Sequence, residues 1–230
     1  MAETDAALHC FRSGRVSSVT AMVYMADSER AAGLATKHGL DVGLHLNLNQ
    51  PYDGPAPAAL KAVHHQVARF LNRSKYAVLF YHPGLRRQFR EVFQSQLQEF
   101  IRLYTKPPTH VDGHQHRHLC ANVLLDNIIP RGWKVRRNFT FWPHEKGLIN
   151  RAYRGATDAL LRLRYGGTDY FFSLGDAIRH RRLERVLQLA RTAQVELMTH
   201  PVREEESSFL LGEESGEALK GLRLASYATL

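Results

Sequence analysis

The sequence is poor in the features that mark disulfide-rich, secreted or membrane-spanning proteins. Cys10 and Cys120 are its only cysteines, and their wide separation fits neither a metal-binding pair nor a disulfide framework. It contains no run of about 18 apolar residues, so we expect no membrane span. The N-terminal segment lacks the basic start and the apolar block of a secretory signal. We therefore expect a reduced, cytoplasmic protein.

Internal repeats, low-complexity segments and abrupt changes of composition are also missing. The 230 residues suffice for one large domain with a substantial core. Hydrophobic residues make up 44% and charged residues 23%, which is the balance of a globular protein. Since no segment resembles a linker, we expect a single domain over residues 1–230. Nothing in the sequence indicates an oligomeric state.

Acidic residues are scarce relative to basic ones. The chain has 22 Asp and Glu against 31 Lys and Arg, a net charge of +9. Such an excess can indicate an anionic partner such as nucleic acid or a membrane surface. The basic residues are scattered, however, and most fall in predicted helices, where a solvated face explains them. Nucleic-acid binding is therefore the least favoured of the functional hypotheses.

Helical and strand-like segments alternate along the chain, which predicts an α/β protein with a parallel sheet or barrel. Apolar periodicity and capping signals predict the helices. Runs rich in β-branched and aromatic residues predict the strands. The expected helices are 3–13, 27–37, 58–72, 85–104, 121–129, 147–165, 176–193 and 213–222. The expected strands are 16–25, 40–48, 109–114, 134–138, 170–174 and 195–200.

Three histidines fall late in predicted strands. In parallel folds, ligands bind at the carboxyl ends of the strands. His45 lies late in 40–48, His114 closes 109–114, and His200 closes 195–200. We therefore expect these imidazoles to face one mouth, with His45 and His114 less than about 8 Å apart if both bind one metal ion.

The segment 109–118 contains four histidines and one aspartate. Alternate side chains of a strand share a face, so His110, Asp112, His114 and His116 could point the same way. Neutral imidazole is the commonest metal ligand, and a nearby carboxylate can bind the metal or orient a ligand. The alternative is a polar loop with unconnected histidines. Together with His45, the cluster favours a metal site.

A metal-dependent hydrolase explains this cluster chemically. Catalytic sites of the zinc type use three protein ligands and leave one position open. A base must then take a proton from water, and an acid must protonate the leaving group. His45 and His114 supply two ligands, and His200 could be the acid. Asp112 is the only acidic residue within reach by sequence, so it is the candidate base.

Five segments of the chain form a recognisable set. Three are strong matches, GLHLNL at 43–48, THVDGHQHRH at 109–118 and ELMTHP at 196–201, and two are weaker, at 14–23 and 222–227. Together they resemble the YdjC-like carbohydrate deacetylases, which include the chitooligosaccharide and hopanoid-associated deacetylases. The segments 43–48 and 109–118 in combination are specific to that family, and the matches span nearly the whole chain in the family's order.

The resemblance implies a distorted (β/α) barrel that removes N-acetyl groups from amino sugars with the help of a divalent metal ion, Mg²⁺ or Zn²⁺. It places the two histidine ligands on His45 and His114, and an acid or substrate contact on His200. Asp112 matches the motif aspartate, and Gly113 stands where a serine is usual. We also expect three residues to contact the sugar: His116, Arg136 and Trp142.

One departure from the family concerns the start of the chain. Family members open with a strand that ends in two adjacent aspartates and Phe-Gly, and Met1 aligns just after it. Asp5 cannot replace that pair, because it begins the following predicted helix. A start codon placed too far downstream and a truncated, inactive relative both explain this. We favour the first, because a missing first strand would leave a neighbouring strand unpaired.

Two alternatives to an active deacetylase remain. The chain could be a non-catalytic barrel that binds a sugar or a metal ion, or a basic nucleic-acid-binding domain. Nucleic-acid binding predicts aromatic residues interleaved with basic ones. Only residues 136–142 show this pattern, and a loop that lines a sugar pocket explains that segment better.

We expect residues 1–230 alone to release little acetate from N-acetylated amino sugars, because the acidic pair is missing. General-base catalysis contributes about 10²- to 10⁴-fold to such reactions. A strand ending in Asp-Asp-Phe-Gly ahead of Met1 should raise the rate, measured as acetate release. Equal rates with and without that strand would show that the acidic pair is dispensable.

Overall fold

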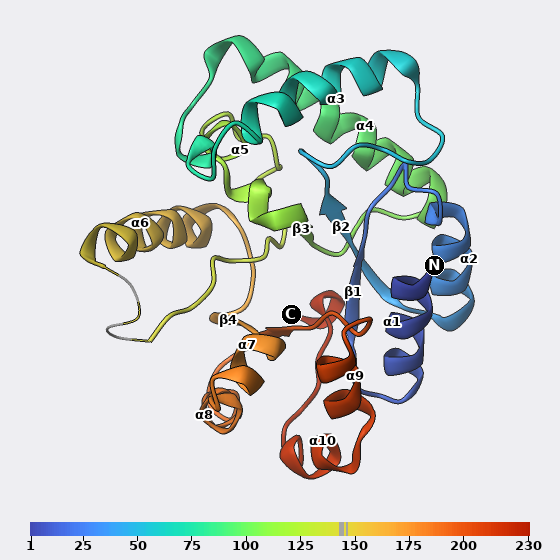
Figure 1. The fold of residues 1–230 in the computed structure, drawn as a ribbon, viewed down its shortest axis with the longest axis vertical. Coiled ribbons are helices and arrows are strands. Elements are labelled where there is room, and N and C mark those ends of the chain that lie inside the picture. The colour runs from blue at the N-terminus through green and yellow to red at the C-terminus, as the bar shows by residue number, and fades with distance from the viewer. Residues whose placement is uncertain (143–144, 146) are drawn as a thin grey trace. The chain divides into compact units, whose positions relative to one another are not determined.

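The computed structural model describes residues 1–142, 145 and 147–230, with Ile149 described by its backbone alone (Figure 1). The chain divides into two compact units. One unit contains residues 1–19 and 136–230, and the other contains residues 20–135. None of the helices in the described ranges is both long and apolar enough to cross a membrane.

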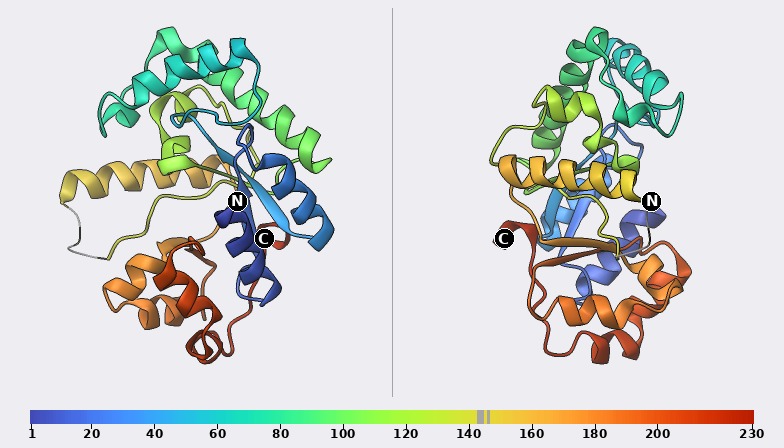
Figure 2. Two further views of the ribbon diagram at one scale, coloured as in Figure 1. Left: turned by 45° about the vertical axis from the view of Figure 1, so that its right-hand side comes forward. Right: turned by 90° about the vertical axis from the view of Figure 1, so that its left-hand side faces the viewer.

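The unit of residues 20–135 combines a small sheet with long helices. The apolar stripe predicted for 85–104 forms one face of a 19-residue helix, and its buried side chains include Phe89, Phe93 and Phe100. Figures 1 and 2 show α3 and α4 side by side. The elements are β1 (Ser18–Ala21, shared with the other unit), α2 (Ser28–His38), β2 (Asp41–Leu46), α3 (Ala58–Leu71), η1 (Ala77–Leu79), η2 (Pro83–Leu85), α4 (Arg86–Tyr104), β3 (Val111–Gly113), η3 (His114–Leu119) and α5 (Ala121–Leu125).

The sheet of this unit has the order β1-β2-β3, and β2 pairs with β3 in parallel. Leu44 lies opposite Val111, and both side chains are fully buried. On the other face, a Cβ atom at Gly43 would lie 2.5 Å from the ring of His110. Glycine is therefore required at position 43, because the buried imidazole of His110 occupies that space.

A buried polar cluster joins α3 and α4 to the loop after β2. The side chain of Gln96 has no exposed surface. It accepts a hydrogen bond from the backbone N–H of Asn47 at 2.9 Å and donates one to the backbone carbonyl of Asn47 at 2.7 Å. His64 of α3 is 3% exposed, and its ring centroid lies 4.3 Å from that of Tyr52. Burial lowers the pKa of His64 to about 4, although a hydrogen bond with the Asn47 backbone opposes the shift.

The unit of residues 1–19 and 136–230 has a sheet of two parallel strands. Phe171 pairs with Glu196 and Phe172 with Leu197 in its register. A core cluster packs Cys10 with Leu174, Phe209 and Leu210. The elements are α1 (Ala2–Arg12), α6 (Leu148–Arg164), β4 (Tyr170–Ser173), α7 (Leu174–Arg179), α8 (Leu183–Leu189), β5 (Val195–Met198), α9 (Glu204–Leu211), α10 (Glu213–Ala218) and η4 (Tyr227–Thr229).

Five of the predicted helices are confirmed with small shifts at their ends, as α1, α2, α3, α4 and α6. The single helix predicted for 176–193 is wrong, because the chain breaks into α7 and α8 around Arg181, whose φ is 53°. The strand predicted for 134–138 is reduced to one bridge between Val135 and Val111. Helix α9 was not predicted.

The fold is a mixed α/β structure with short parallel strands, as the sequence predicts. The strands of the described ranges form two separate sheets, and no closed barrel is found among them. The chain forms two compact units, and the expectation that residues 1–230 are a single domain stays a prediction.

The buried His64 should make stability depend on pH. The folded state keeps this imidazole neutral down to a pKa of about 4, whereas the unfolded chain takes up the proton near 6.5. Stability contributed by neutral His64 is therefore present above pH 6.5 and is lost as the pH falls toward 4, by up to about 3 kcal/mol. Urea denaturation between pH 4 and 7 measures this loss.

His64→Phe keeps a ring beside Tyr52 and should flatten this part of the pH profile. His65→Ala removes an exposed neighbour on the same helix whose charge adds to the lowered pKa of His64, so it should reduce the pH dependence far less than His64→Phe. Identical profiles for the wild type and His64→Phe would contradict the assignment.

Candidate active site

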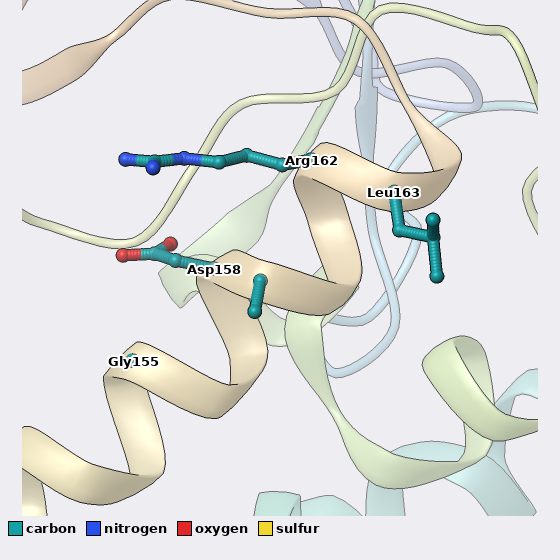
Figure 3. A pocket seen from close by; sticks show the side chains of 5 residues that line it. Gly155, Asp158, Arg162 and Leu163 are labelled. Carbon is teal, nitrogen blue, oxygen red and sulfur yellow. The ribbon is translucent and has the colours of Figure 1, made fainter.

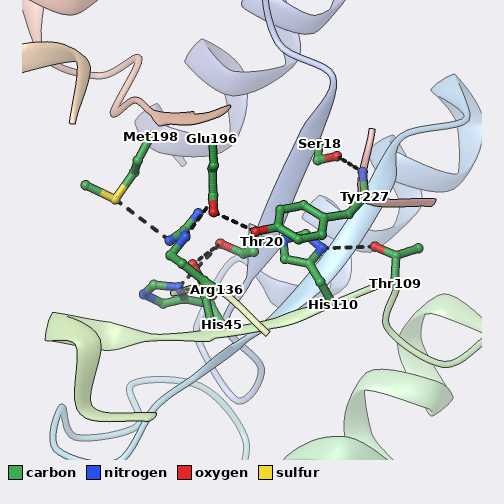
Figure 4. A network of polar contacts seen from close by, with 10 residues as sticks. Ser18, Thr20, His45, Thr109, His110, Arg136, Glu196, Met198 and Tyr227 are labelled. Atoms are coloured by element: carbon green, nitrogen blue, oxygen red, sulfur yellow. Dashed lines mark hydrogen bonds and ion pairs between the residues drawn. The ribbon is translucent and has the colours of Figure 1, made fainter. Parts of the chain in front are cut away.

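The parallel register of β2 and β3 brings His45 and Asp112 together. The two residues lie opposite each other, and Nδ1 of His45 donates to Oδ1 of Asp112 at 2.7 Å (Figure 4). Asp112 has no exposed surface, and Thr20 donates to its second carboxylate oxygen at 3.3 Å. With the proton held on Nδ1, the lone pair of Nε2 is left for a ligand.

His114 lies next to this pair, directly after β3. Its ring centroid is 5.8 Å from that of His45, and the rings are nearly perpendicular. The two imidazoles are therefore as close as the sequence predicts. Burial lowers the pKa of His114, and nearby His45 and Arg117 add to this effect against the opposing charge of Asp112. A lowered pKa keeps His114 neutral, which is the form that binds metals.

The expected alignment of His110, Asp112, His114 and His116 on one strand face does not extend beyond Gly113. The strand ends at Gly113, and Gln115 and His116 adopt left-handed backbone angles with φ of 51° and 57°. The strand alternation therefore does not extend to His116, whose ring centroid lies 6.3 Å from that of His118. Its role as a sugar contact stays a prediction.

Arg136 lies in the other unit and is held by a buried ion pair. Its Nε lies 2.7 Å from Oε1 of Glu196, and Tyr227 donates to the second oxygen of Glu196 at 2.6 Å (Figure 4). The guanidinium also lies 5.1 Å from the centroid of Phe171. The side chain is thus fixed by its neighbours, and its predicted contact with the sugar stays a prediction.

Trp142 makes extensive ring contacts within the same unit. It stacks on Phe172 with centroids 5.5 Å apart, and Cζ of Arg185 lies 3.7 Å from its centroid. These contacts fix the orientation of the indole and already engage its π surface. The predicted stacking of Trp142 on a sugar ring stays a prediction.

His200 follows β5, which ends at Met198 rather than at His200 as predicted. Its backbone N–H donates to Oε2 of Glu206 at 2.7 Å, and its Nδ1 lies 3.8 Å from Oε1. Burial alone would raise the pKa of Glu206, but hydrogen bonds with His200 and Thr199 outweigh it and lower that pKa. A charged, buried carboxylate therefore lies behind the half-exposed His200 ring.

The predicted site residues are divided between the two units. His45, Asp112 and His114 meet in the unit of residues 20–135, whereas the other unit contains His200, Arg136 and Trp142. No group of three metal-binding side chains is found in the part of the chain that the structure describes.

Sequence reasoning missed three residues that hold predicted site residues, namely Thr20, Glu196 and Glu206. The motifs that contain His45 and His114 mark the strand ends. The partners lie elsewhere in the chain, and only tertiary structure pairs them. Glu206 stands in an acidic run six positions after His200, Glu196 opens the matched segment ELMTHP, and Thr20 lies in the weaker match at 14–23.

A surface hollow lies along α6, away from these histidines in the sequence. Figure 3 shows Asp158 and Arg162 extending from the helix there. Burial raises the pKa of Asp158. None of the predicted site residues lines this hollow, so it adds nothing to the candidate site. Its lining is Gly155, Asp158, Ala159, Arg162 and Leu163.

Asp112→Ala should free Nδ1 of His45 and let its proton move to Nε2. Nitrogen-15 NMR of the histidine rings should show this change of tautomer, with a loss of about 1–3 kcal/mol in unfolding free energy. Thr20→Val removes only the longer contact to Asp112 and should have the smaller effect on both. An unchanged His45 tautomer in Asp112→Ala would show that the carboxylate does not orient the ring.

Comparison with known proteins gives a consistent family. The family model described as YdjC-like protein matches residues 2–226. A mouse carbohydrate deacetylase is 31% identical, and the match covers 84% of this chain and 71% of the mouse protein. A human carbohydrate deacetylase is 32% identical, covering 84% of this chain and 68% of the human protein. A chitooligosaccharide deacetylase of Serratia marcescens is 32% identical, covering 50% of this chain and 45% of that protein. The chain therefore belongs to the YdjC-like family.

Proposed function

We propose that the protein is a metal-dependent carbohydrate deacetylase that hydrolyses N-acetyl groups of amino sugars or chitooligosaccharide-like substrates. Membership of the YdjC-like family and the names of the relatives support a deacetylase. The observation that carries the metal-dependent part is the pairing of His45 with His114 in front of the buried Asp112.

Nε2 of His45 and the imidazole of His114 would hold the metal ion. The donor set fits such an ion, because His114 is kept neutral and the Nδ1 proton of His45 is held by Asp112. Imidazole suits Zn²⁺ better than Mg²⁺, which prefers oxygen ligands. A metal ion bound there would polarise the acetyl carbonyl as a Lewis acid.

His200 would protonate the leaving amine. Its side chain is 42% exposed, so a substrate can reach it, and Glu206 behind it is 1% exposed. The buried carboxylate lies 3.8 Å from Nδ1 of His200 and can orient the imidazole toward a leaving group. Asp112 has both oxygens engaged by His45 and Thr20, which supports an orienting role more than that of a base.

We further propose that the two parallel sheets belong to one distorted (β/α) barrel, as the resemblance implies. His116, Arg136 and Trp142 would then contact the sugar. We assign the protein to the cytoplasm, because Cys10 and Cys120 are buried, free thiols, which persist in a reducing compartment.

Zinc calorimetry tests the metal site. His45→Ala and His114→Ala should each lower the zinc affinity at least about tenfold, since even residues that only support a ligand contribute 10- to 100-fold. His65→Ala changes an exposed histidine of α3 and should leave the affinity unchanged. Affinity that survives both site variants would place the metal elsewhere.

Acetate release from N-acetylated chitooligosaccharides, measured with the same variants, tests the reaction. His200→Ala should retain zinc affinity and lose about 10²- to 10⁴-fold in rate, the usual contribution of an acid or base. Zinc binding without acetate release, both by residues 1–230 and after a strand ending in Asp-Asp-Phe-Gly is added ahead of Met1, would favour a non-catalytic sugar- or metal-binding protein instead.

A further inference from the structure

The connection between α3 and α4 concentrates positive charge. Residues 54–90 contain no Asp or Glu, so this segment carries most of the net charge of +9. All of its basic side chains are exposed. They are Lys61, Arg69, Arg73, Lys75, Arg86, Arg87 and Arg90.

An exposed apolar surface lies in the middle of this segment. Phe80 is 65% exposed, Tyr76 56%, Leu79 43% and Tyr81 38%. Single exposed apolar residues are common on protein surfaces, but four large ones within six positions mark an interaction site. We call residues 73–81 the α3–α4 tip.

Hydrogen bonds to α5 and the residue after it hold the end of this tip. The hydroxyl of Tyr81 donates to Oδ1 of Asp126 at 3.0 Å. The backbone N–H of His82 donates to the side chain of Asn122 at 2.9 Å, and that side chain donates back to the His82 carbonyl at 3.0 Å. The apolar side chains are therefore presented by an anchored segment.

The charge around the tip is only partly neutralised. Arg86 pairs with Asp126 at 2.9 Å. Within the described ranges, Arg69, Arg73, Lys75 and Arg87 make no ion pair. Open positive charge beside exposed aromatic and aliphatic side chains complements a partner that is anionic at its surface and apolar beneath it.

We propose that the α3–α4 tip docks the protein on an anionic lipid surface. Tyr and Phe rings favour the membrane–water interface, and each Lys or Arg near an anionic bilayer strengthens binding about fivefold, from about 1 kcal/mol. Lys and Arg stems can lie along the apolar layer while their charges stay in water. Leu79 favours lipid over nucleic acid, because an aliphatic side chain offers no ring for a base to stack on.

Sedimentation with vesicles of phosphatidylcholine, with and without phosphatidylglycerol, tests this docking. The wild-type protein should bind the anionic vesicles and release them at high salt, because exposed charges are screened. Arg73→Glu with Lys75→Glu should weaken binding at least about 20-fold. Leu79→Ser with Phe80→Ser should weaken it about tenfold or more, through the loss of buried apolar area.

Matched variants separate the tip from net charge and general hydrophobicity. Lys37→Glu with Lys106→Glu makes the same change in net charge at exposed sites outside the segment and should have a much smaller effect. Ile101→Ser removes a side chain of 40% exposure from α4 and should leave binding unchanged. Circular dichroism of each variant checks that it folds.

Three results would overturn the proposal. The first is a wild-type protein that binds neither vesicle type. The second is a Lys37/Lys106 variant that loses as much vesicle binding as the tip variants. The third is binding to single-stranded RNA that requires Arg73 and Lys75, without binding to anionic vesicles. The assay does not use deacetylation, so its outcome is independent of the proposed reaction.

Discussion

The candidate site depends on the register of β2 against β3. With His45 opposite Asp112, a buried carboxylate without exposed surface finds its partner in the neighbouring strand. A shift of one residue would turn each side chain to the opposite face and leave that charge buried among apolar groups. The same register places His110 over Gly43, where only a glycine leaves room for the ring. Packing and the polar pair thus require the same alignment.

The turn after β3 shows how the family motif is adapted in this chain. A Cβ atom at Gly113 would lie 2.9 Å from the side chain of His118, which has no exposed surface. The resemblance leads one to expect serine at this position, but the buried His118 fills the space that a serine would need. Gly113 therefore belongs with His118, and the two residues determine how η3 leaves the strand and where it presents His114.

Local patterns in the sequence predicted local structure well. The apolar stripe of α4 follows from periodicity, and the strand patterns place His45 near the end of β2 and His114 directly after β3. The break at Arg181 was missed, because a non-glycine residue there adopts a positive φ that its sequence does not signal. The partners Thr20, Glu196 and Glu206 were missed for another reason. Thr20 and Glu196 each contact a residue far away in the sequence, and Glu206 reaches back to His200 from the following helix.

The positive charges of the chain are not equivalent, and their surroundings differ between the two units. In the unit of residues 1–19 and 136–230, two arginines are buried. Arg136 pairs with Glu196, and Arg137 donates to backbone carbonyls. The arginines and lysines of the α3–α4 segment are exposed instead, and four of them lack an ion pair within the described ranges. Structural use explains the first group. The second group is open to an external partner, and the apolar side chains between its members suit the proposed lipid surface.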